Sequence, residues 1–277
     1  MPKAFFGSIS SDLATNIALH LQKNNWQIEG TYRKFNSKVE ELYSNGAKLY
    51  ELDFNKKIDI DKLFEDNYIA KDWKFSMISP SIIGKLGSFG RVDWKEWLKT
   101  FELNSISQFK IIHNLLPRRI KNQSSILWLW GGPGTNSAPK DHSALILAKL
   151  TQIKFVEILN EEYEDLIPFA VGPGWVKTKT HDEVLKMGKD AGNKYQEVKE
   201  RIESGKFTSI NSIIDFLDWI LKQNKEIIGG RNFSIPSDIW GDPKLEELLR
   251  KNKDAFKLRR YQNDWRPDNY STNFIPK

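Results

Sequence analysis

Two short stretches decide the fold of this chain: residues 143–149 read SALILAK, and residues 171–178 read VGPGWVKT. From Leu145 to about Glu162, apolar residues recur at helical spacing with charged residues between them, which predicts an amphipathic helix. Leu145 and Lys149 are one turn apart, so they share one face of this helix. The second stretch predicts a strand that ends in a turn at Pro173 and Gly174.

Segments typical of strands and helices alternate along the rest of the chain. Strand-like segments occupy residues 4–6, 26–32, 47–54, 75–78, 125–130 and 227–235. Helical periodicity covers residues 94–116 and 210–221, and a short helix is expected at 245–249. The alternation predicts a single α/β domain with a Rossmann-like, doubly wound parallel sheet flanked by helices.

The composition excludes several kinds of functional site and partner. The chain has 277 residues, a net charge of +6 and no cysteine, which excludes disulfides, thiolate nucleophiles and cysteine-bound metals. Its four histidines lack metal-ligand spacing, so no metal site is expected. The lysines are spread along the chain, which argues against nucleic acid and favours an anionic cofactor or substrate. No apolar run reaches the roughly 18–20 residues of a membrane span, so we expect a cytoplasmic protein without a membrane partner.

The first strand leads into a turn that suits phosphate. Residues 4–6 are apolar, and residues 7–12 read GSISSD before the next helix. A helix start presents unpaired backbone N–H groups and the positive end of the helix dipole. We therefore expect the cofactor pyrophosphate to contact Gly7, Ser8, Ser10, Ser11, Asp12 and Leu13. The alternative is that Ser and Asp in this segment only cap the helix.

A basic pair follows the second strand. Arg33 and Lys34 occupy a position where dinucleotide sites discriminate between cofactors, and no acid stands beside them. An arginine there pairs with the extra phosphate of NADP, whereas an acid binds the ribose hydroxyls of NAD. The pair favours NADP, with NAD as the second choice. The alternative is a solvated basic turn.

Lys149, Pro173, Gly174 and Thr178 together carry a family pattern. The chain resembles the short-chain dehydrogenases/reductases, whose catalytic helix carries Tyr-x-x-x-Lys and whose next strand ends in Pro-Gly followed by Thr. The resemblance covers about residues 3–240 and implies a dinucleotide-binding domain at 1–240, with a C-terminal extension at 241–277 packed on it. It implies an NAD(P)-dependent oxidoreductase acting on a carbonyl or hydroxyl substrate, such as a sugar or nucleotide-linked sugar. Leu145 occupies the tyrosine position, and because leucine cannot transfer a proton, the usual general acid/base is missing.

The resemblance assigns further roles. Lys149 would bind the cofactor ribose, Asn104 would help to hold Lys149 through water, Asp53 would lie near the adenine, and Ser79 would follow a strand near the nicotinamide ribose. Pro173, Gly174 and Thr178 would also contact the cofactor. Ser8, Asp12 and Ala14 stand where the family usually has glycines, and glycines at 131–134 occupy the strand end that usually carries the catalytic serine.

Several groups could replace the missing proton donor. Thr135, Ser137 and His142 follow the glycine-rich strand end, and His142 is the most capable of them because histidine titrates near neutral pH. Downstream, Lys186, Lys189 and Lys194 could meet an anionic small-molecule substrate.

Two alternatives to a redox enzyme remain open at this point. The chain could be a catalytically inactive relative that serves as a binding or regulatory subunit, or it could catalyse a different reaction in the same cleft. The helices at 94–116 and 145–162 are those through which relatives pair, so a homodimer or homotetramer is expected.

Overall fold

The computed structural model describes residues 1–132, 137–176, 181, 185–186, 188, 193–205 and 207–260, without the side chains of residues 57, 58, 193, 194 and 197. Within these residues, parallel strands form a seven-stranded sheet in the order β3-β2-β1-β4-β5-β6-β7. The strands are β1 (Lys3–Gly7), β2 (Gln27–Tyr32), β3 (Lys48–Glu51), β4 (Phe75–Ile78), β5 (Ser125–Trp130), β6 (Leu166–Gly172) and β7 (Asn232–Ser234). The strand order reverses between β1 and β4, which is where open α/β sheets bind ligands at their carboxyl ends.

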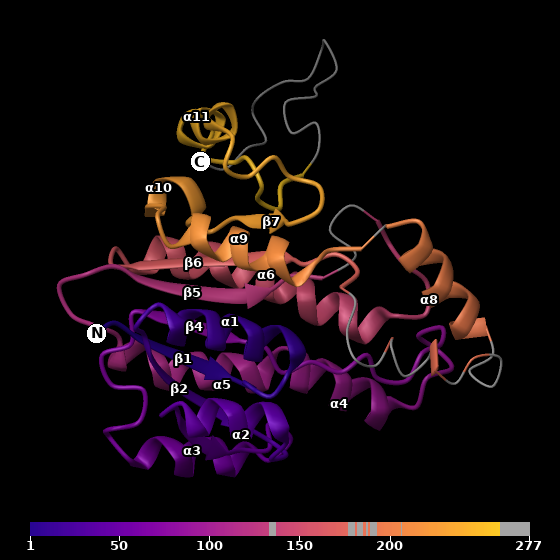
Figure 1. Ribbon diagram of the computed structural model, residues 1–277. Coiled ribbons are helices and arrows are strands. Elements are labelled where there is room, and N and C mark those ends of the chain that lie inside the picture. The colour runs from indigo at the N-terminus through magenta and orange to yellow at the C-terminus, as the bar shows by residue number, and fades with distance from the viewer. Residues whose placement is uncertain are drawn as a thin grey trace, which may run out of the picture.

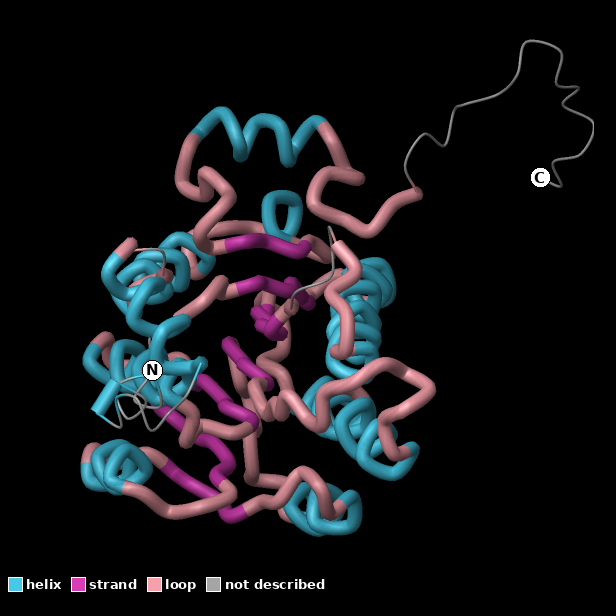
Figure 2. Tube along the Cα trace, turned by 90° about the vertical axis from the view of Figure 1, so that its right-hand side faces the viewer, coloured by secondary structure: helices cyan, strands magenta, loops and turns pink. Residues whose placement is uncertain are grey.

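Helices cover both faces of the sheet, so the molecule has three layers (Figures 1 and 2). One face packs against α1 (Asp12–Lys23), α2 (Ser37–Ser44), α9 (Ile210–Ile220), α10 (Lys225–Ile228) and α11 (Pro243–Lys251). The other packs against α3 (Lys57–Glu65), α4 (Trp94–Asn104), α5 (Ile106–Leu115) and α6 (Ser143–Glu162). A short 3-10 helix, η1 (Leu116–Arg118), precedes β5, and α8 (Asn193–Glu203) precedes α9. The predicted Rossmann-like architecture is confirmed.

The central strands are buried on both faces. Phe6 and Trp128 point into the core beneath α1 and α9, whereas Phe5 and Leu127 point into the core beneath α5 and α6. Alternate side chains of a strand point to opposite faces, so a strand covered on both sides must be apolar throughout. This explains why residues 126–130 of β5 are all apolar.

The last strand is shorter than predicted. Residues 227–235 were expected to form one strand, but the chain forms the single turn of α10 before β7 begins at Asn232. The Asn224 side chain accepts a hydrogen bond from the Ile227 N–H and caps this turn. Gly229 then passes so close to Asn160 on α6 that a Cβ would collide with its side-chain oxygen. Gly229 therefore allows close contact with α6, and Gly230, with φ +70°, allows the turn into β7.

The predicted helix at 94–116 is broken. Ser105, with φ −136° and ψ −75°, separates α4 from α5. The apolar periodicity continues across the break, which is why the sequence predicts one helix. The break lies beside Asn104, a proposed site residue, and it frees the Asn104 carbonyl from the regular helical pattern.

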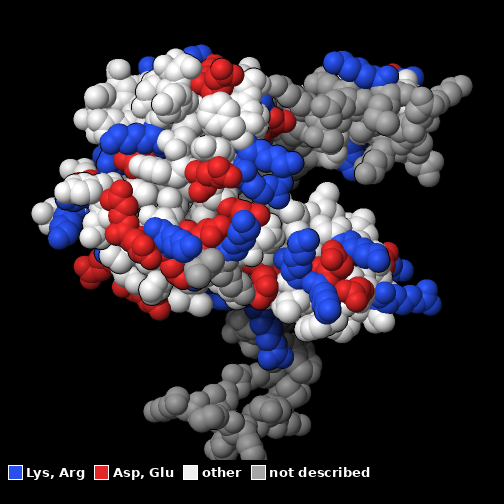
Figure 3. Space-filling model, turned by 90° about the horizontal axis from the view of Figure 1, so that it is seen from below, with Lys and Arg blue, Asp and Glu red and all other residues white. Residues whose placement is uncertain are grey.

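Charged side chains on the surface are dispersed, as the spread of lysines along the sequence predicts. On the face that carries α2 and α3, acidic and basic side chains are interspersed (Figure 3). Among the described residues, no helix is both long enough and apolar enough to cross a membrane. Leu245 and Leu249 of α11 lie in the same core as α9, while the proposed domain boundary at residue 240 stays a prediction.

Candidate functional site

A small cavity lies where the strand order reverses, at the carboxyl ends of β1 to β4. Its volume is about 120 Å³. It is lined by Ser8, Ser10, Arg33, Leu52, Asp53, Phe54, Asn55, Pro80, Ser81, Ile82 and Leu103. Four residues predicted to bind the cofactor, Ser8, Ser10, Arg33 and Asp53, are thus brought to one cavity from three separate loops.

Ser8 adopts a backbone conformation that favours glycine. Its φ is +70°, in the left-handed region, at a position where the resemblance expects glycine. The Ser8 N–H donates to Oγ1 of Thr31 at 3.0 Å, and the Ile9 N–H donates to the Thr31 carbonyl at 2.7 Å. The turn after β1 is therefore fixed to β2, and it keeps the geometry of a glycine turn without the glycine.

The start of α1 combines capping with an ion pair. The Ser11 hydroxyl accepts a hydrogen bond from the Ala14 N–H at 3.2 Å, so the expected capping is present. The Asp12 carboxylate pairs with the Lys38 ammonium. Leu13 packs against the core beneath α1, and Gly7 ends β1. Capping occupies the Ala14 N–H, and phosphate binding by this turn stays a prediction.

Arg33 and Asp53 face the same cavity with opposite charge. Although partial burial raises it, the pKa of Asp53 is lowered overall by hydrogen bonds from Asn55 and by the charges of Arg33 and Lys56. The Asn55 N–H and side-chain amide both donate to the Asp53 carboxylate, at 3.0 and 2.8 Å. Asp53 is thus a fixed anion, and Arg33 brings a cation to the same cavity.

Asn104 holds the loop that forms the far wall of this cavity. Its side-chain oxygen accepts from the Ser81 hydroxyl at 2.7 Å and from the Ile82 N–H at 3.3 Å. Its amide donates to the carbonyls of Ile82 and Thr100, at 2.9 and 2.8 Å. One residue before Pro80, the Ser79 hydroxyl donates to the Gly7 carbonyl at 2.9 Å. Asn104 and Ser79 therefore fix the backbone of residues 79–82, while their predicted roles beside Lys149 and the nicotinamide ribose stay predictions.

Lys149 is a buried amine at the end of β5. Only 5% of the residue is exposed, and burial lowers the pKa of the Lys149 amine to about 8. Its Nζ donates to Oε1 of Gln152 at 3.5 Å. Gly132 lies against its stem: a Cβ on Gly132 would be 2.7 Å from Lys149 Cγ. Glycine at this strand end makes room for the lysine.

Leu145 and His142 lie at the start of α6. Leu145 is half-buried, one turn before Lys149 on α6. His142 precedes α6, and its Nδ1 is hydrogen-bonded to the Lys140 carbonyl at 2.7 Å. Seven residues of helix separate His142 from Lys149, a rise of about 10 Å. Ser137 is exposed. A proton-donating role of His142 stays a prediction.

The Pro-Gly turn after β6 borders a second cavity of about 510 Å³. Gly174 has φ +72°, and a Cβ there would lie 2.8 Å from Oγ1 of Thr208. Three aromatic residues, Trp175, Phe207 and Trp240, line this cavity together with Arg201. The Arg201 guanidinium lies over the Trp175 ring at 5.6 Å. Thr178, Thr135, Lys189 and the side chain of Lys194 lie outside the described residues.

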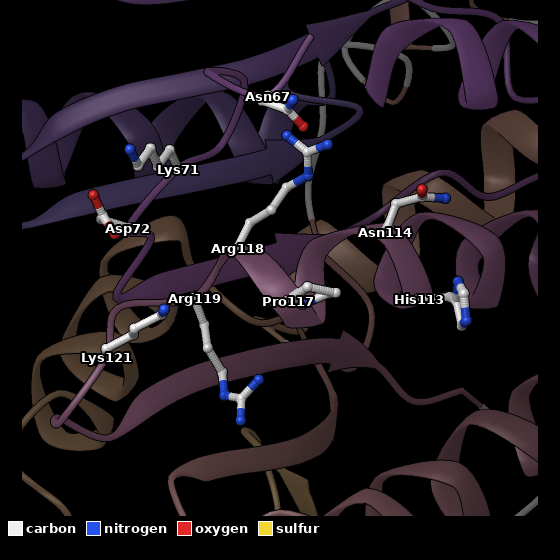
Figure 4. Close-up of a pocket in the computed structure, with 9 residues that line it drawn as sticks. All are labelled: Asn67, Lys71, Asp72, His113, Asn114, Pro117, Arg118, Arg119 and Lys121. Atoms are coloured by element: carbon white, nitrogen blue, oxygen red, sulfur yellow. The ribbon is translucent and has the colours of Figure 1, made fainter. Parts of the chain in front are cut away.

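A third cavity, of about 460 Å³, has basic residues in its wall but is built differently (Figure 4). Its two arginines point in opposite directions. The Arg118 guanidinium donates to the carbonyls of Phe64, Asp66 and Ile69. The Arg119 guanidinium forms two hydrogen bonds, 2.9 and 2.8 Å, with the carboxylate of Asp165. These arginines serve the fold. Among the described residues, no group of three or more histidines and carboxylates could hold a metal ion.

Sequence analysis missed two buried polar residues at the site, Gln108 and Gln152, and the exposed Ser81. Gln152 bonds to both Lys149 and the Asn104 backbone. Gln108 donates to the Pro80 carbonyl at 2.6 Å, and Ser81 bonds to Asn104. Two signals were available: Gln152 is a polar residue three positions after Lys149, and Gln108 is a polar residue on an otherwise apolar helix face.

Comparison with known proteins agrees with the fold. The family model described as enoyl-(acyl carrier protein) reductase matches residues 8–236. In the comparison with curated proteins, no sequence matches the chain. A short-chain dehydrogenase/reductase from Saccharomyces cerevisiae is 15% identical and superposes with a TM-score of 0.70 over 89% of this chain and 99% of that chain. A family protein from Francisella tularensis is 17% identical, with a TM-score of 0.70 over 85% of this chain and 97% of that chain.

A third similar structure is a variant of actinorhodin polyketide ketoreductase with NADPH. It is 16% identical, with a TM-score of 0.70 over 84% of this chain and 95% of that chain. At these identities the superpositions show a shared fold, and the family match covers most of the sequence. The chain belongs to the short-chain dehydrogenase/reductase family of NAD(P)-binding oxidoreductases.

Proposed function

We propose that the chain is an NADP-dependent oxidoreductase that acts on a carbonyl or hydroxyl group of an anionic small molecule. The observation that carries this proposal is the cavity at the reversal of strand order, which unites Arg33 with Ser8 and Ser10. An arginine beside a phosphate-binding turn suits the 2′-phosphate of NADP.

The residues present fit this cofactor. Arg33 would pair with the 2′-phosphate, the turn at Ser8 to Leu13 would receive the pyrophosphate, and Lys149 would bind the nicotinamide ribose. Asp53 would lie near the adenosine. The bound cofactor would supply or accept the hydride, whereas the protein orients it and excludes water. The structurally similar ketoreductase variant is itself described with NADPH, which supports the choice of NADP for this chain.

The source of the proton distinguishes the proposed reaction from that of the family pattern. Leu145 cannot donate one, so the proton would come from water, from a substrate group or from His142. The Lys149 amine, with its pKa lowered to about 8 by burial, would place a positive charge beside the site at neutral pH. We therefore expect slow turnover, because a positioned acid or base usually contributes about 10² to 10⁴ in rate.

The cavity beside the Pro-Gly turn supports an anionic substrate. Its aromatic walls suit a flat ring or the apolar face of a sugar, and Arg201 provides a cation. A sugar or nucleotide-linked sugar stays a prediction. The description of the matching family model adds an enoyl thioester to the substrates that should be tested. We expect the cytoplasm as the place of action.

A homodimer or homotetramer is part of the proposal. Trp94, Leu98, Ile106, Leu147 and Ile158, on α4, α5 and α6, are exposed large apolar residues. Exposed apolar side chains gathered on neighbouring helices are typical of an interface. Light scattering coupled to gel filtration at several concentrations measures the assembly, and a monomer at all of them would contradict this part.

The second candidate function is that of a nucleotide-binding subunit without redox activity. Leu145 favours it, together with Gly132 packed against Lys149, because neither the usual tyrosine nor a serine beside it is present. This candidate shares the cofactor site and differs only in turnover.

One titration tests the proposal. Purified protein is titrated with NADPH and with NADH, followed by fluorescence and thermal shift, beside Arg33→Ala and Lys34→Ala. Arg33 lines the cavity and Lys34 does not, so only Arg33→Ala should weaken NADPH binding. The absence of binding at millimolar concentration would overturn both candidates. Binding followed by screens of carbonyl, sugar and enoyl substrates without turnover would favour the second.

A further inference from the structure

Gln152 lies between the Lys149 amine and the backbone carbonyl of Asn104. Lys149 and Gln152 are three residues apart on α6 and share one face of the helix. Both are buried, with 5% and 0% exposure. Nζ of Lys149 donates to the side-chain oxygen of Gln152 at 3.5 Å. This is a long hydrogen bond from an amine that lacks an ion pair within the described residues.

The other end of the amide is also bound. The Gln152 side-chain nitrogen donates a short hydrogen bond to the backbone carbonyl of Asn104. That carbonyl is available because the helix breaks at Ser105, directly after Asn104. A lysine ammonium can only donate and a carbonyl can only accept, so one orientation of the amide satisfies both partners.

The Asn104 side chain cannot replace Gln152 in this role. Its oxygen and nitrogen are bonded to Ser81, Ile82 and Thr100. Asn104 therefore uses its side chain for the cavity wall and its backbone for α6. The result is a continuous chain of hydrogen bonds from the cavity wall, through Asn104 and Gln152, to Lys149.

We propose that Gln152 is a positioning residue that fixes the Lys149 amine relative to the cofactor cavity by joining it to the Asn104 carbonyl. In the family pattern described above, water links the asparagine and the lysine. Here a side chain performs that linkage. The inference rests on the proposed function for its effect on the cofactor, while the linkage itself belongs to the protein alone.

The removal of the amide should free the lysine. Gln152→Leu keeps similar volume but loses both hydrogen bonds, and we expect about a tenfold weaker binding of NADPH at pH 7, as for one hydrogen bond to a charged group. Gln152→Glu keeps an acceptor for Lys149 and adds a negative charge. Opposite charge favours the protonated amine, so the loss of NADPH affinity at alkaline pH should move to higher pH in Gln152→Glu.

Gln108→Leu is the matched control. Gln108 is equally buried and bonds to the Pro80 carbonyl, and no hydrogen bond joins it to Lys149 within the described residues. Its variant should lose a similar amount of stability yet keep the wild-type pH midpoint of NADPH binding. Circular dichroism and thermal melts identify any variant that does not fold, and Gln152→Met then replaces Gln152→Leu.

A measurement without cofactor separates this inference from the proposed function. The free energy of unfolding is compared for wild type and Lys149→Met from pH 7 to 10.5, and again with Gln152→Glu in both backgrounds. With Gln152→Glu, the difference between the two curves at pH 7 should become smaller, and the pH at which it begins to shrink should rise. An unchanged difference at pH 7, an unchanged onset of its decrease and an unchanged binding profile would together overturn the role of Gln152. Failure of wild type to bind NADPH would overturn the proposed function alone, and the unfolding comparison would still decide the inference.

Discussion

Gly132 lies directly against the stem of Lys149, so close that a Cβ on Gly132 would be 2.7 Å from Lys149 Cγ. β5 ends two residues earlier, and α6 carries Lys149 in its second turn. The contact joins the end of β5 to α6, the two elements that carry the proposed site around Lys149. It also shows why a serine at this residue and the observed position of Lys149 exclude each other without movement.

Gly132→Ala should displace Lys149. A methyl group at this position must push a buried side chain away, so we expect a loss of about 1–3 kcal/mol in stability from overpacking, together with weaker NADPH binding. Urea unfolding and fluorescence titration measure the two effects. Gly90→Ala is the control, because a Cβ there meets nothing within 4 Å. Equal effects of the two substitutions would contradict the contact.

Leu145→Tyr should create or increase reductase activity. The residue is half-buried on the Lys149 face of α6, and a tyrosine hydroxyl one turn before the amine would supply the missing acid. We expect a gain of about 10² to 10⁴ in kcat on a substrate that already turns over. Leu145→Phe adds the ring without the hydroxyl and should give no gain. An equal gain in both variants would mean that packing, and not proton transfer, limits the rate.

Ser8→Gly should stabilise the protein. Ser8 has φ +70°, and a left-handed conformation costs a residue with a side chain about 1–2 kcal/mol, which the greater entropy loss of glycine partly offsets. The expected net gain is about 1 kcal/mol, seen as a higher melting temperature. Ser10→Gly is the matched control in the same turn. Since Ser10 lacks a positive φ, its substitution should destabilise the protein or leave it unchanged.

Lys149→Met should stabilise the nucleotide-free protein at neutral pH. Burial lowers the pKa of Lys149 from 10.5 to about 8, so the folded state pays for a charged amine at all pH values below 8, a cost of about 3 kcal/mol. As pH rises from 8 toward 10.5, the folded protein releases this proton before the unfolded chain does, and wild type recovers the difference. Urea unfolding at several pH values measures it.

The exposed Lys95 provides the control for this prediction. Lys95→Met should leave the free energy of unfolding nearly unchanged across the same pH range, because the side chain is in water in both states. A gain from Lys149→Met that stays constant between pH 7 and 10.5 would contradict a desolvated amine.

The order of the strands and the residues at the strand ends follow from the sequence alone. Short, nearly continuous apolar runs are typical of strands covered on both faces, and the segments at 75–78 and 125–130 have the observed bounds of β4 and β5. Arg33 was predicted from its place after the second strand, where dinucleotide sites discriminate between cofactors, and Asp53 from the family resemblance. Both line the same cavity, and their contact with a cofactor stays a prediction. The family pattern in the sequence sets Leu145 at the tyrosine position, which stays a prediction.

Only the tertiary structure decided which polar groups meet. The break at Ser105 leaves the apolar period intact, so the sequence does not reveal the free carbonyl of Asn104. Gln152 bonds to that carbonyl across two helices far apart in the chain, and Gly229 packs against Asn160 instead of continuing a strand. Such contacts depend on distances of a few ångströms between elements. Local propensity decides which residues form helices and strands. The packing of these elements decides where the Lys149 amine lies and how far burial lowers its pKa.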